Sequence, residues 1–205
     1  MKTTFLITLT IIALTSCKPS DPNKNVEEGK VEGNLYTSEE IGWTMEIPQG
    51  WKVIDKEKSE EFQEQGKKAL ENNTDATVDL NGLKMLISFQ KDQFNIFQST
   101  SEPFNQEYEG QWEENNAATK AIIYATYVNM GIQADSTATK TISIDGLDFQ
   151  SYTFAIRAPE GNVIMTQTMF TRYINGFGFG ANINYNNEKD RDEMFKAFLN
   201  SKFKK

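Results

Sequence analysis

Residues 163–185 read VIMTQTMFTRYINGFGFGANINY, two strand-like segments joined by Asn175 and Gly176. Both segments are rich in β-branched and aromatic residues, which favour strands. Asn-Gly is a strong signal for a two-residue hairpin, because a type I′ turn needs positive φ at both positions. The stretch therefore predicts an antiparallel hairpin of Val163–Ile174 and Phe177–Tyr185.

Two more strand-like segments precede this hairpin, at residues 139–144 and 149–157. Their connections, Asp145-Gly146 and residues 159–162, are of hairpin length, so the sheet should be antiparallel here. After the hairpin, Asn187 can cap a helix over residues 188–203. The apolar stripe of that helix should lie on the sheet, and it consists of Met194, Phe195, Phe198 and Leu199.

The chain before these four strand-like segments alternates between strand-like and helix-like patterns. Strands are expected at residues 35–37, 43–47 and 83–90, an extended segment at 51–54, and helices at 57–71 and 106–130. Residues 92–104 give no clear prediction. The order indicates one globular α+β domain over residues 35–205, an antiparallel β-sheet with helices packed on it.

The first sixteen residues have the pattern of a secretion signal. Lys2 gives a positive start, and residues 5–14 form an apolar run that is too short to span a bilayer. Leu14-Thr15-Ser16-Cys17 then resembles the lipobox of bacterial lipoproteins. That resemblance implies cleavage between Ser16 and Cys17 and lipid attachment to Cys17, which would hold the chain at a membrane.

Residues 17–34 are predicted to be the lipidated cysteine and a flexible tether, since they contain no aromatic residue. Asp21, Asn23, Asn25 and Glu32 match four positions of a calcium-binding EF-hand loop, but Val26 stands where that loop needs glycine. We therefore expect a solvated segment and no metal site. Lys18 follows the cysteine where aspartate would signal inner-membrane retention in some Gram-negative systems, so we expect the outer membrane of the cell envelope.

Composition excludes several function classes. The formal charge of the 205-residue chain is −8, which disfavours binding to nucleic acid. The chain has no histidine, so Ser-His and Cys-His nucleophile pairs and histidine-based zinc sites are excluded. Neighbouring carboxylates such as Glu113-Glu114 are typical of a solvated helix face. We expect no catalytic residues, no metal and no cofactor.

A few residues remain as candidates for binding. Trp43, Trp51 and Trp112 could form a binding surface if they are exposed. Gly176, Gly178 and Gly180 superficially match a phosphate-binding loop, but they alternate within a strand pattern. Small residues there more simply allow a helix to pack closely on that face of the sheet.

Residues 42–51, GWTMEIPQGW, together with the closing strands and the terminal helix, resemble the PsbP-like superfamily. This superfamily includes the extrinsic photosystem II subunit and DcrB-type bacterial lipoproteins. The resemblance covers about residues 35–203. It implies an α/β/α sandwich with an antiparallel sheet, used mainly for protein binding, and it carries over no catalytic residues.

Three functions follow as hypotheses. The first is a membrane-anchored envelope lipoprotein, not an enzyme, whose domain binds or scaffolds an envelope protein. The second is a carrier of a small apolar ligand, with the aromatic residues of 94–104 roofing a cavity. The third is a carboxylate-dependent hydrolase, which requires two carboxyl groups facing each other across a cleft.

Overall fold

The structure of the protein is a computed structural model that describes residues 21–204. The predicted signal peptide and Cys17 lie outside the described residues. Within residues 21–204, no helix is long and apolar enough to cross a membrane.

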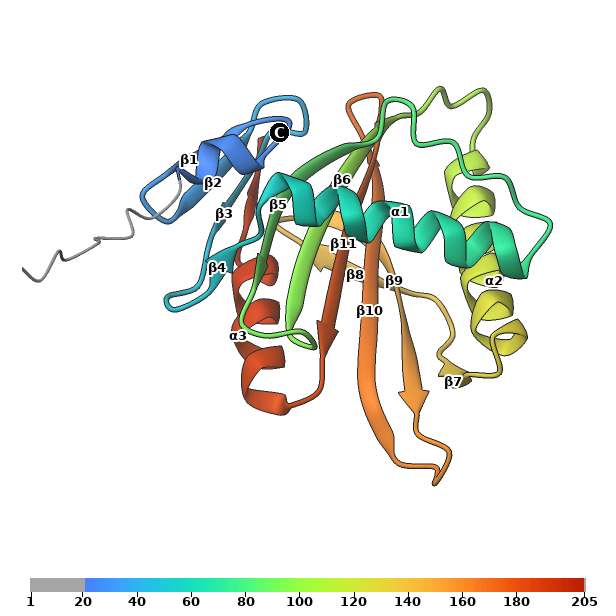
Figure 1. Ribbon diagram of the computed structural model, residues 1–205. Helices are drawn as coiled ribbons and strands as arrows, with labels where there is room; N and C mark the ends of the chain where they lie inside the picture. Colours follow the sequence, from blue (N-terminus) through green and yellow to red (C-terminus); the bar gives the residue numbers. More distant parts are fainter. Residues whose placement is uncertain (1–20, 205) are drawn as a thin grey trace, which may run out of the picture.

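A large antiparallel sheet forms the centre of the domain (Figure 1). Its strand order is β4-β5-β6-β11-β10-β9-β7, and β8 pairs with the first part of β9. The bounds are β4 (Lys52–Val53), β5 (Lys84–Gln90), β6 (Ile96–Pro103), β7 (Gln133–Ser136), β8 (Lys140–Ile144), β9 (Leu147–Arg157), β10 (Val163–Ile174) and β11 (Phe177–Tyr185).

The β10–β11 hairpin has the predicted bounds and turn. Ile174 pairs with Phe177, and the two turn residues between them have positive φ values, 53° at Asn175 and 88° at Gly176. This hairpin lies in the middle of the sheet, between β6 and β9. The predicted meander β8-β9-β10-β11 is therefore confirmed.

A second, four-stranded sheet has the order β1-β2-β3-β12. Its strands are β1 (Lys30–Glu32), β2 (Leu35–Ser38), β3 (Trp43–Glu46) and β12 (Lys202–Phe203). Because β12 is a strand, the prediction that the last helix continues to residue 203 is wrong. The buried Phe203 pairs with Trp43, and its backbone N–H donates to Asp145 Oδ2 over 3.0 Å.

The tether prediction is wrong for residues 21–34. A 3₁₀ turn at Pro22–Asn25 precedes β1. The Asn23 side chain forms two hydrogen bonds with the backbone of Val31: it accepts from Val31 N over 2.6 Å and donates to Val31 O over 2.9 Å. Val31 is buried. Asn23, one of the residues that matched the calcium loop, thus has a structural partner, and the folded domain begins well before residue 35.

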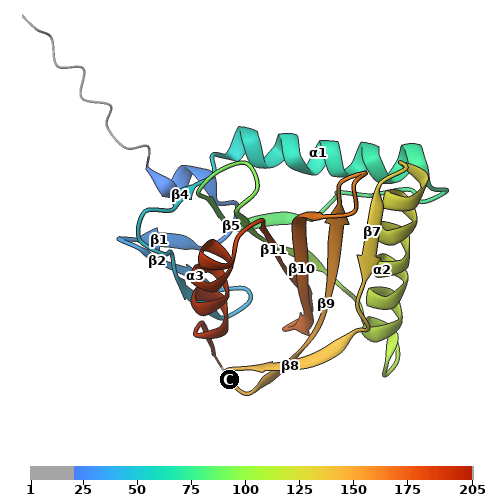
Figure 2. The same cartoon turned by 90° about the horizontal axis from the view of Figure 1, so that it is seen from below.

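Helices cover both faces of the large sheet, which gives an α/β/α arrangement (Figures 1 and 2). α3 (Glu188–Leu199) lies on one face, together with the small sheet. α1 (Lys56–Asn73) and α2 (Gln111–Asn129) lie on the other. The Asn187 side chain accepts from Asp190 N over 2.9 Å, which confirms it as the N-cap of α3.

Candidate functional site

The three candidate tryptophans are buried, so the condition under which they could form a binding surface, exposure to solvent, is not met. Trp43 is 0%, Trp51 7% and Trp112 8% exposed. Trp43 lies in the core between the two sheets, where its ring is 5.0 Å from that of Phe179. Trp112, on α2, packs against Phe104 with ring centroids 5.0 Å apart. Trp43 and Trp112 therefore have a packing role, as do most aromatic residues with this spacing.

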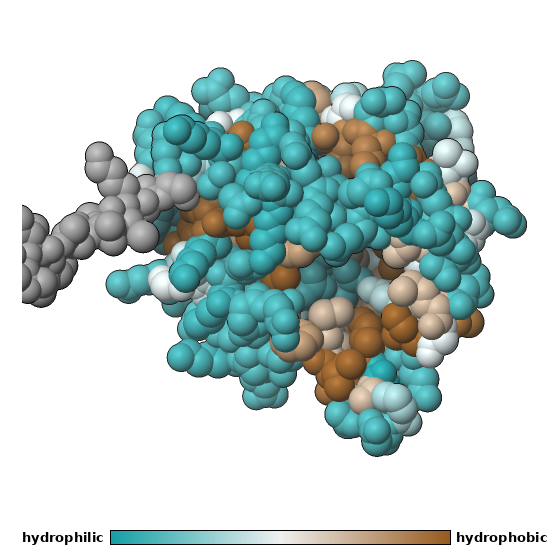
Figure 3. Space-filling model, viewed as in Figure 1, coloured by the Kyte–Doolittle hydropathy of each residue, from teal (hydrophilic) through white to brown (hydrophobic). Residues whose placement is uncertain are grey.

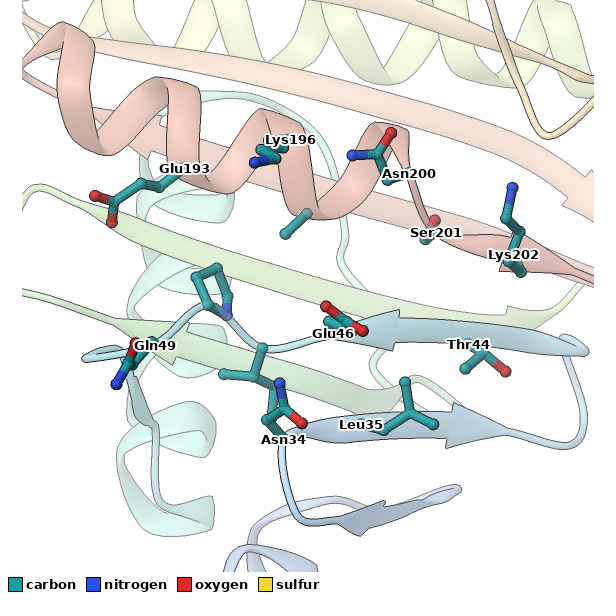
Figure 4. A pocket seen from close by; sticks show the side chains of 13 residues that line it. Asn34, Leu35, Thr44, Glu46, Gln49, Glu193, Lys196, Asn200, Ser201 and Lys202 are labelled. Atoms are coloured by element: carbon teal, nitrogen blue, oxygen red, sulfur yellow. The ribbon is translucent and has the colours of Figure 1, made fainter.

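An open groove of about 790 Å³ lies instead between the small sheet and α3 (Figure 4). Strands β2 and β3 form one wall, with Leu35, Thr44 and Glu46. The last turns of α3 and β12 form the other, with Lys196, Asn200 and Lys202. Apolar surface lies between these polar groups, and it is contributed by Leu35, Ile47, Pro48 and Ala197.

The groove follows from the local structure of its two walls. Alternation along β2 and β3 buries Tyr36, Trp43 and Met45 and turns the neighbouring residues outward. Pro48 then ends the strand run, because proline has no backbone N–H for a strand partner. On the other wall, Met194 and Phe198 anchor α3 in the core, which leaves Lys196 and Asn200 exposed.

One end of the groove is fixed by a polar cluster around Trp51. The indole Nε1 of Trp51 donates to Glu193 Oε2 over 2.8 Å. Lys91 Nζ lies 3.2 Å from the same oxygen and 2.6 Å from Asp190 Oδ1. The hydrogen bond from Trp51, together with Lys91, holds the pKa of Glu193 below its usual value. This cluster ties α3 to β4 and β5.

Because of this cluster, we expect the stability of the domain to decrease at low pH. Burial opposes the charged form of Asp190, but hydrogen bonds from Lys91 and Asn187 hold its pKa below the ordinary value. A carboxyl whose folded pKa is depressed stabilises the fold above its unfolded pKa of about 4, and loses that contribution as the pH falls through the folded pKa. The free energy of unfolding, measured with urea, is therefore expected to fall between about pH 5 and pH 2.

Lys91→Met tests the origin of this dependence. Without the ammonium group, the pKa values of Asp190 and Glu193 should move toward ordinary values, so the acid-dependent loss should be smaller than in the parent protein. Lys68→Met is the matched control, because Lys68 pairs with Glu64 on the exposed face of α1. A Lys91→Met variant with the full parental pH dependence would contradict this assignment.

The hydrolase hypothesis requires two carboxyl groups across a cleft, and the groove has Glu46 on one wall and Glu193 on the other (Figure 4). A glycosidase of this kind needs a general acid whose pKa is raised. The pKa of Glu193 is lowered, because Trp51 and Lys91 both stabilise its charged form. Glu193 is thus unsuited to be that acid, and its contacts give it a positioning role between α3 and the sheet.

The aromatic stretch 94–104 does not roof a cavity. Phe97 is fully buried in the main core, stacked on Phe89 with centroids 4.8 Å apart. Phe104 packs on Trp112, and Phe94 is partly exposed at 38%. The observed positions of these three residues therefore give no support to the hypothesis that the domain carries a small apolar ligand.

Of the three glycines at positions 176, 178 and 180, only Gly178 has the predicted packing role, since a Cβ on Gly176 would meet nothing within 4 Å and one on Gly180 only Thr100. A Cβ on Gly178 would lie 2.7 Å from two ring carbons of Trp112. Gly178 therefore allows α2 to lie close to the sheet. Within residues 21–204, no group of three or more acidic, cysteine or histidine side chains is placed to hold a metal ion.

Sequence reasoning did not single out the polar residues of the groove. Lys196, Asn200 and Thr44 belong to no binding motif, and they come together because β12 brings the end of α3 beside β3. The one local indication was Pro48-Gln49-Gly50, which predicts a break in regular structure next to the strands. The groove begins at that break.

Comparisons with known proteins give a structural match only. No family model matches the chain, and no curated protein matches it in sequence. Among solved structures, the chain is similar to the solution structure of cyanobacterial PsbP (CyanoP) from Synechocystis sp. PCC 6803, with 10% identity and a TM-score of 0.52. The match covers 86% of this chain and 98% of that one. The chain therefore has a PsbP-like α+β fold, as the resemblance of its sequence implied.

Proposed function

We propose that the chain is a lipid-anchored lipoprotein of the bacterial cell envelope, and that its non-catalytic domain binds a protein in the same membrane through the groove between β2–β3 and α3. The lipobox at residues 14–17 supports the anchor. The position of the groove relative to that anchor supports the proposal that the groove binds a protein of the same membrane.

The groove continues toward the start of the described chain. A neighbouring hollow shares Asn34, Ile47, Pro48 and Gln49 with it and reaches Val31 and Pro22. Four peptide units separate Cys17 from Asp21, which corresponds to at most about 14 Å of extended chain. A lipid on Cys17 would thus keep this end of the domain, and the groove with it, close to the bilayer.

The chemistry of the groove suits a protein segment. Its walls carry charges of both signs, from Glu46 and Glu193 and from Lys196 and Lys202, around apolar surface. Protein interfaces typically have an apolar centre and a polar rim. A partner in the same membrane would meet this surface without crossing the compartment.

The lipid anchor is tested with Cys17→Ser. The parent chain is expected to carry acyl label and to fractionate with membranes, whereas the variant should lose both properties because no thiol accepts the lipid. Fractionation of both proteins with membranes, with acyl label on neither, would overturn the anchor.

The docking surface is tested separately by in-cell photocrosslinking. A photoreactive residue at Leu35 or Asn200, both exposed on the groove, is expected to capture one membrane protein. The same residue at Asn72, exposed on α1, is the control and should not capture it. Equal capture from Asn72 and Asn200 would overturn the assignment of the groove.

A further inference from the structure

The edge of β3 that faces α3 is only partly covered by another strand. β12 pairs with β3 at Trp43 and Thr44, and the chain before β12 turns away into α3. Within residues 21–204, no other strand pairs with this edge. Glu46, the last residue of β3, therefore has a strand partner on one side only, where it lies opposite Leu35 of β2.

The backbone hydrogen bonds around β3 show where the groups of Glu46 point. Along an antiparallel strand, the N–H and C=O of successive residues point alternately to one neighbour and to the other. Lys204 N donates to Gly42 O over 2.7 Å, so the even-numbered residues of this stretch point toward β12. Ile47 N donates to Asn34 O over 2.7 Å, so the odd-numbered residues point toward β2. The N–H and C=O of Glu46 therefore point to the uncovered edge.

This open edge, the N–H and C=O of Glu46, is limited on both sides. On one side, β12 occupies the edge as far as Thr44. On the other side, Pro48 has no N–H, and its C=O accepts from Trp51 N over 3.2 Å. Within residues 21–204, neither backbone group of Glu46 forms a hydrogen bond on that side. The open edge thus offers one donor and one acceptor to a neighbouring chain.

The groove of Figure 4 lies beside the open edge and provides room for such a chain. Glu46 and Pro48 line it on the strand side, and Ala197 and Asn200 line it on the α3 side. Neighbouring strands in a sheet are about 4.8 Å apart, so a segment that pairs with Glu46 would lie in this groove. The groove has a volume of about 790 Å³ and is open to solvent, which gives such a segment access.

Apolar surface continues along the path of this segment. A second hollow of about 460 Å³ adjoins the groove and shares Ile47 and Pro48 with it. Val31, Trp51 and Val53 also line this hollow. Figure 3 shows hydrophobic surface on this side of the molecule, beside the start of the described chain. Because successive side chains of an extended segment point to opposite sides, every second one would pack on apolar surface.

Two charged side chains of the groove are available to a bound segment. Within residues 21–204, the carboxylate of Glu46 and the ammonium group of Lys196 form no ion pair, whereas Glu193 pairs with Lys91. Glu46 and Lys196 are both exposed and lie on opposite walls of the groove. A segment with one basic and one acidic side chain would complement both of them.

We propose that an extended segment of a partner protein adds to β3 in line with β12, with its backbone hydrogen-bonded to Glu46. This inference rests on the proposed role of the groove in protein binding, and it specifies the partner as a strand that combines apolar residues with a basic and an acidic one. In such strand addition, main-chain hydrogen bonds give affinity and side-chain pockets give specificity. A helical segment would leave the two groups of Glu46 unpaired, because a helix bonds its own backbone groups internally.

The test repeats the in-cell photocrosslinking from Asn200 with two substitutions at one position. Glu46→Pro removes the N–H of the open edge, and it should lower capture at least about tenfold because the bound segment loses its donor. Glu46→Ala is the matched control, since it keeps the N–H and removes the charge. It should lower capture at most about threefold, because exposed ion pairs contribute little. Proline is tolerated on edge strands whose N–H faces solvent, so the melting temperature of Glu46→Pro should stay close to that of the parent.

A second measurement does not depend on how well Glu46→Pro folds. In the crosslinked complex of the parent chain, purified from membranes, the amide of Glu46 should exchange its hydrogen at least about tenfold more slowly than in the free protein. Hydrogen exchange followed by mass spectrometry measures this rate. An unchanged rate at Glu46 would show that no strand is added there, and the proposal would be wrong.

The possible outcomes separate this inference from the proposed function. If Glu46→Pro captures as much partner as the parent, or if the proline and alanine variants lose capture equally, strand addition is wrong, although the groove still binds a protein. If Asn200 captures no more than the control position Asn72, both proposals fail together. Identification of the captured protein as a second copy of this chain would also rule out the partner strand proposed here.

Discussion

Replacing Trp43 by alanine is expected to lower the free energy of unfolding by about 3–5 kcal/mol, the usual cost of removing a buried aromatic side chain. Trp43 is fully buried and connects the small sheet to the large one. Its ring centroid lies 5.0 to 6.4 Å from those of five other aromatic residues, Tyr36, Phe97, Phe179, Phe198 and Phe203. Because these partners come from both sheets and from α3, the cavity would open where three elements meet.

Urea unfolding followed by circular dichroism measures this effect, and Trp43→Phe is its control. Within residues 21–204 the indole Nε1 of Trp43 has no hydrogen-bond partner. Phenylalanine keeps a ring in the core and removes that donor, so it should cost clearly less than alanine. A Trp43→Ala variant within 1 kcal/mol of the parent would show that Trp43 is not part of the core.

Elements with local signals were the ones that the sequence could predict. The β10–β11 hairpin combined alternating strand residues with Asn175-Gly176, and the structure has the same bounds. α3 likewise begins directly after Asn187, whose side chain caps it. In both cases the deciding interactions are between residues close in sequence, so composition and spacing contain them.

Elements that depend on distant residues were missed. In β6 the positions facing the α3 core are Phe97, Ser99 and Ser101, so two of three are serines and the apolar alternation is lost. Ser99 can be buried because its hydroxyl donates to Ile87 O on β5 over 2.7 Å. β7 is an edge strand with mostly exposed residues, and it forms only by pairing with β9.

The tether and the site were missed for the same reason. Residues 21–34 have too few apolar side chains to fold alone, yet Val31 pairs with Tyr36 and enters a core built by other segments. The walls of the groove come from residues 34–49 and 193–202, which are far apart in the sequence and adjacent in space. Neither stretch carries a binding motif, because what defines the groove is the space between them.

Gly178→Ala is expected to lower the free energy of unfolding by about 1–3 kcal/mol, because it overpacks the contact between β11 and α2. The new Cβ would lie 2.7 Å from Cη2 and Cζ3 of Trp112. The ring has little room to retreat, since its other neighbour is Phe104 at 5.0 Å. In a domain of this size each kcal/mol corresponds to about 2–4 °C in melting temperature, so differential scanning calorimetry can resolve the change.

Gly180→Ala is the matched control on the same strand and face. There the Cβ would meet only Thr100 Oγ1, at 3.3 Å, a contact that a small shift of the threonine can relieve, so the loss should be smaller. Combining Gly178→Ala with Trp112→Phe should cost less than the sum of the two single changes, because the smaller ring makes room for the methyl group. Additive losses, or equal losses at the two glycines, would mean that the close approach of Trp112 does not determine the need for glycine at position 178.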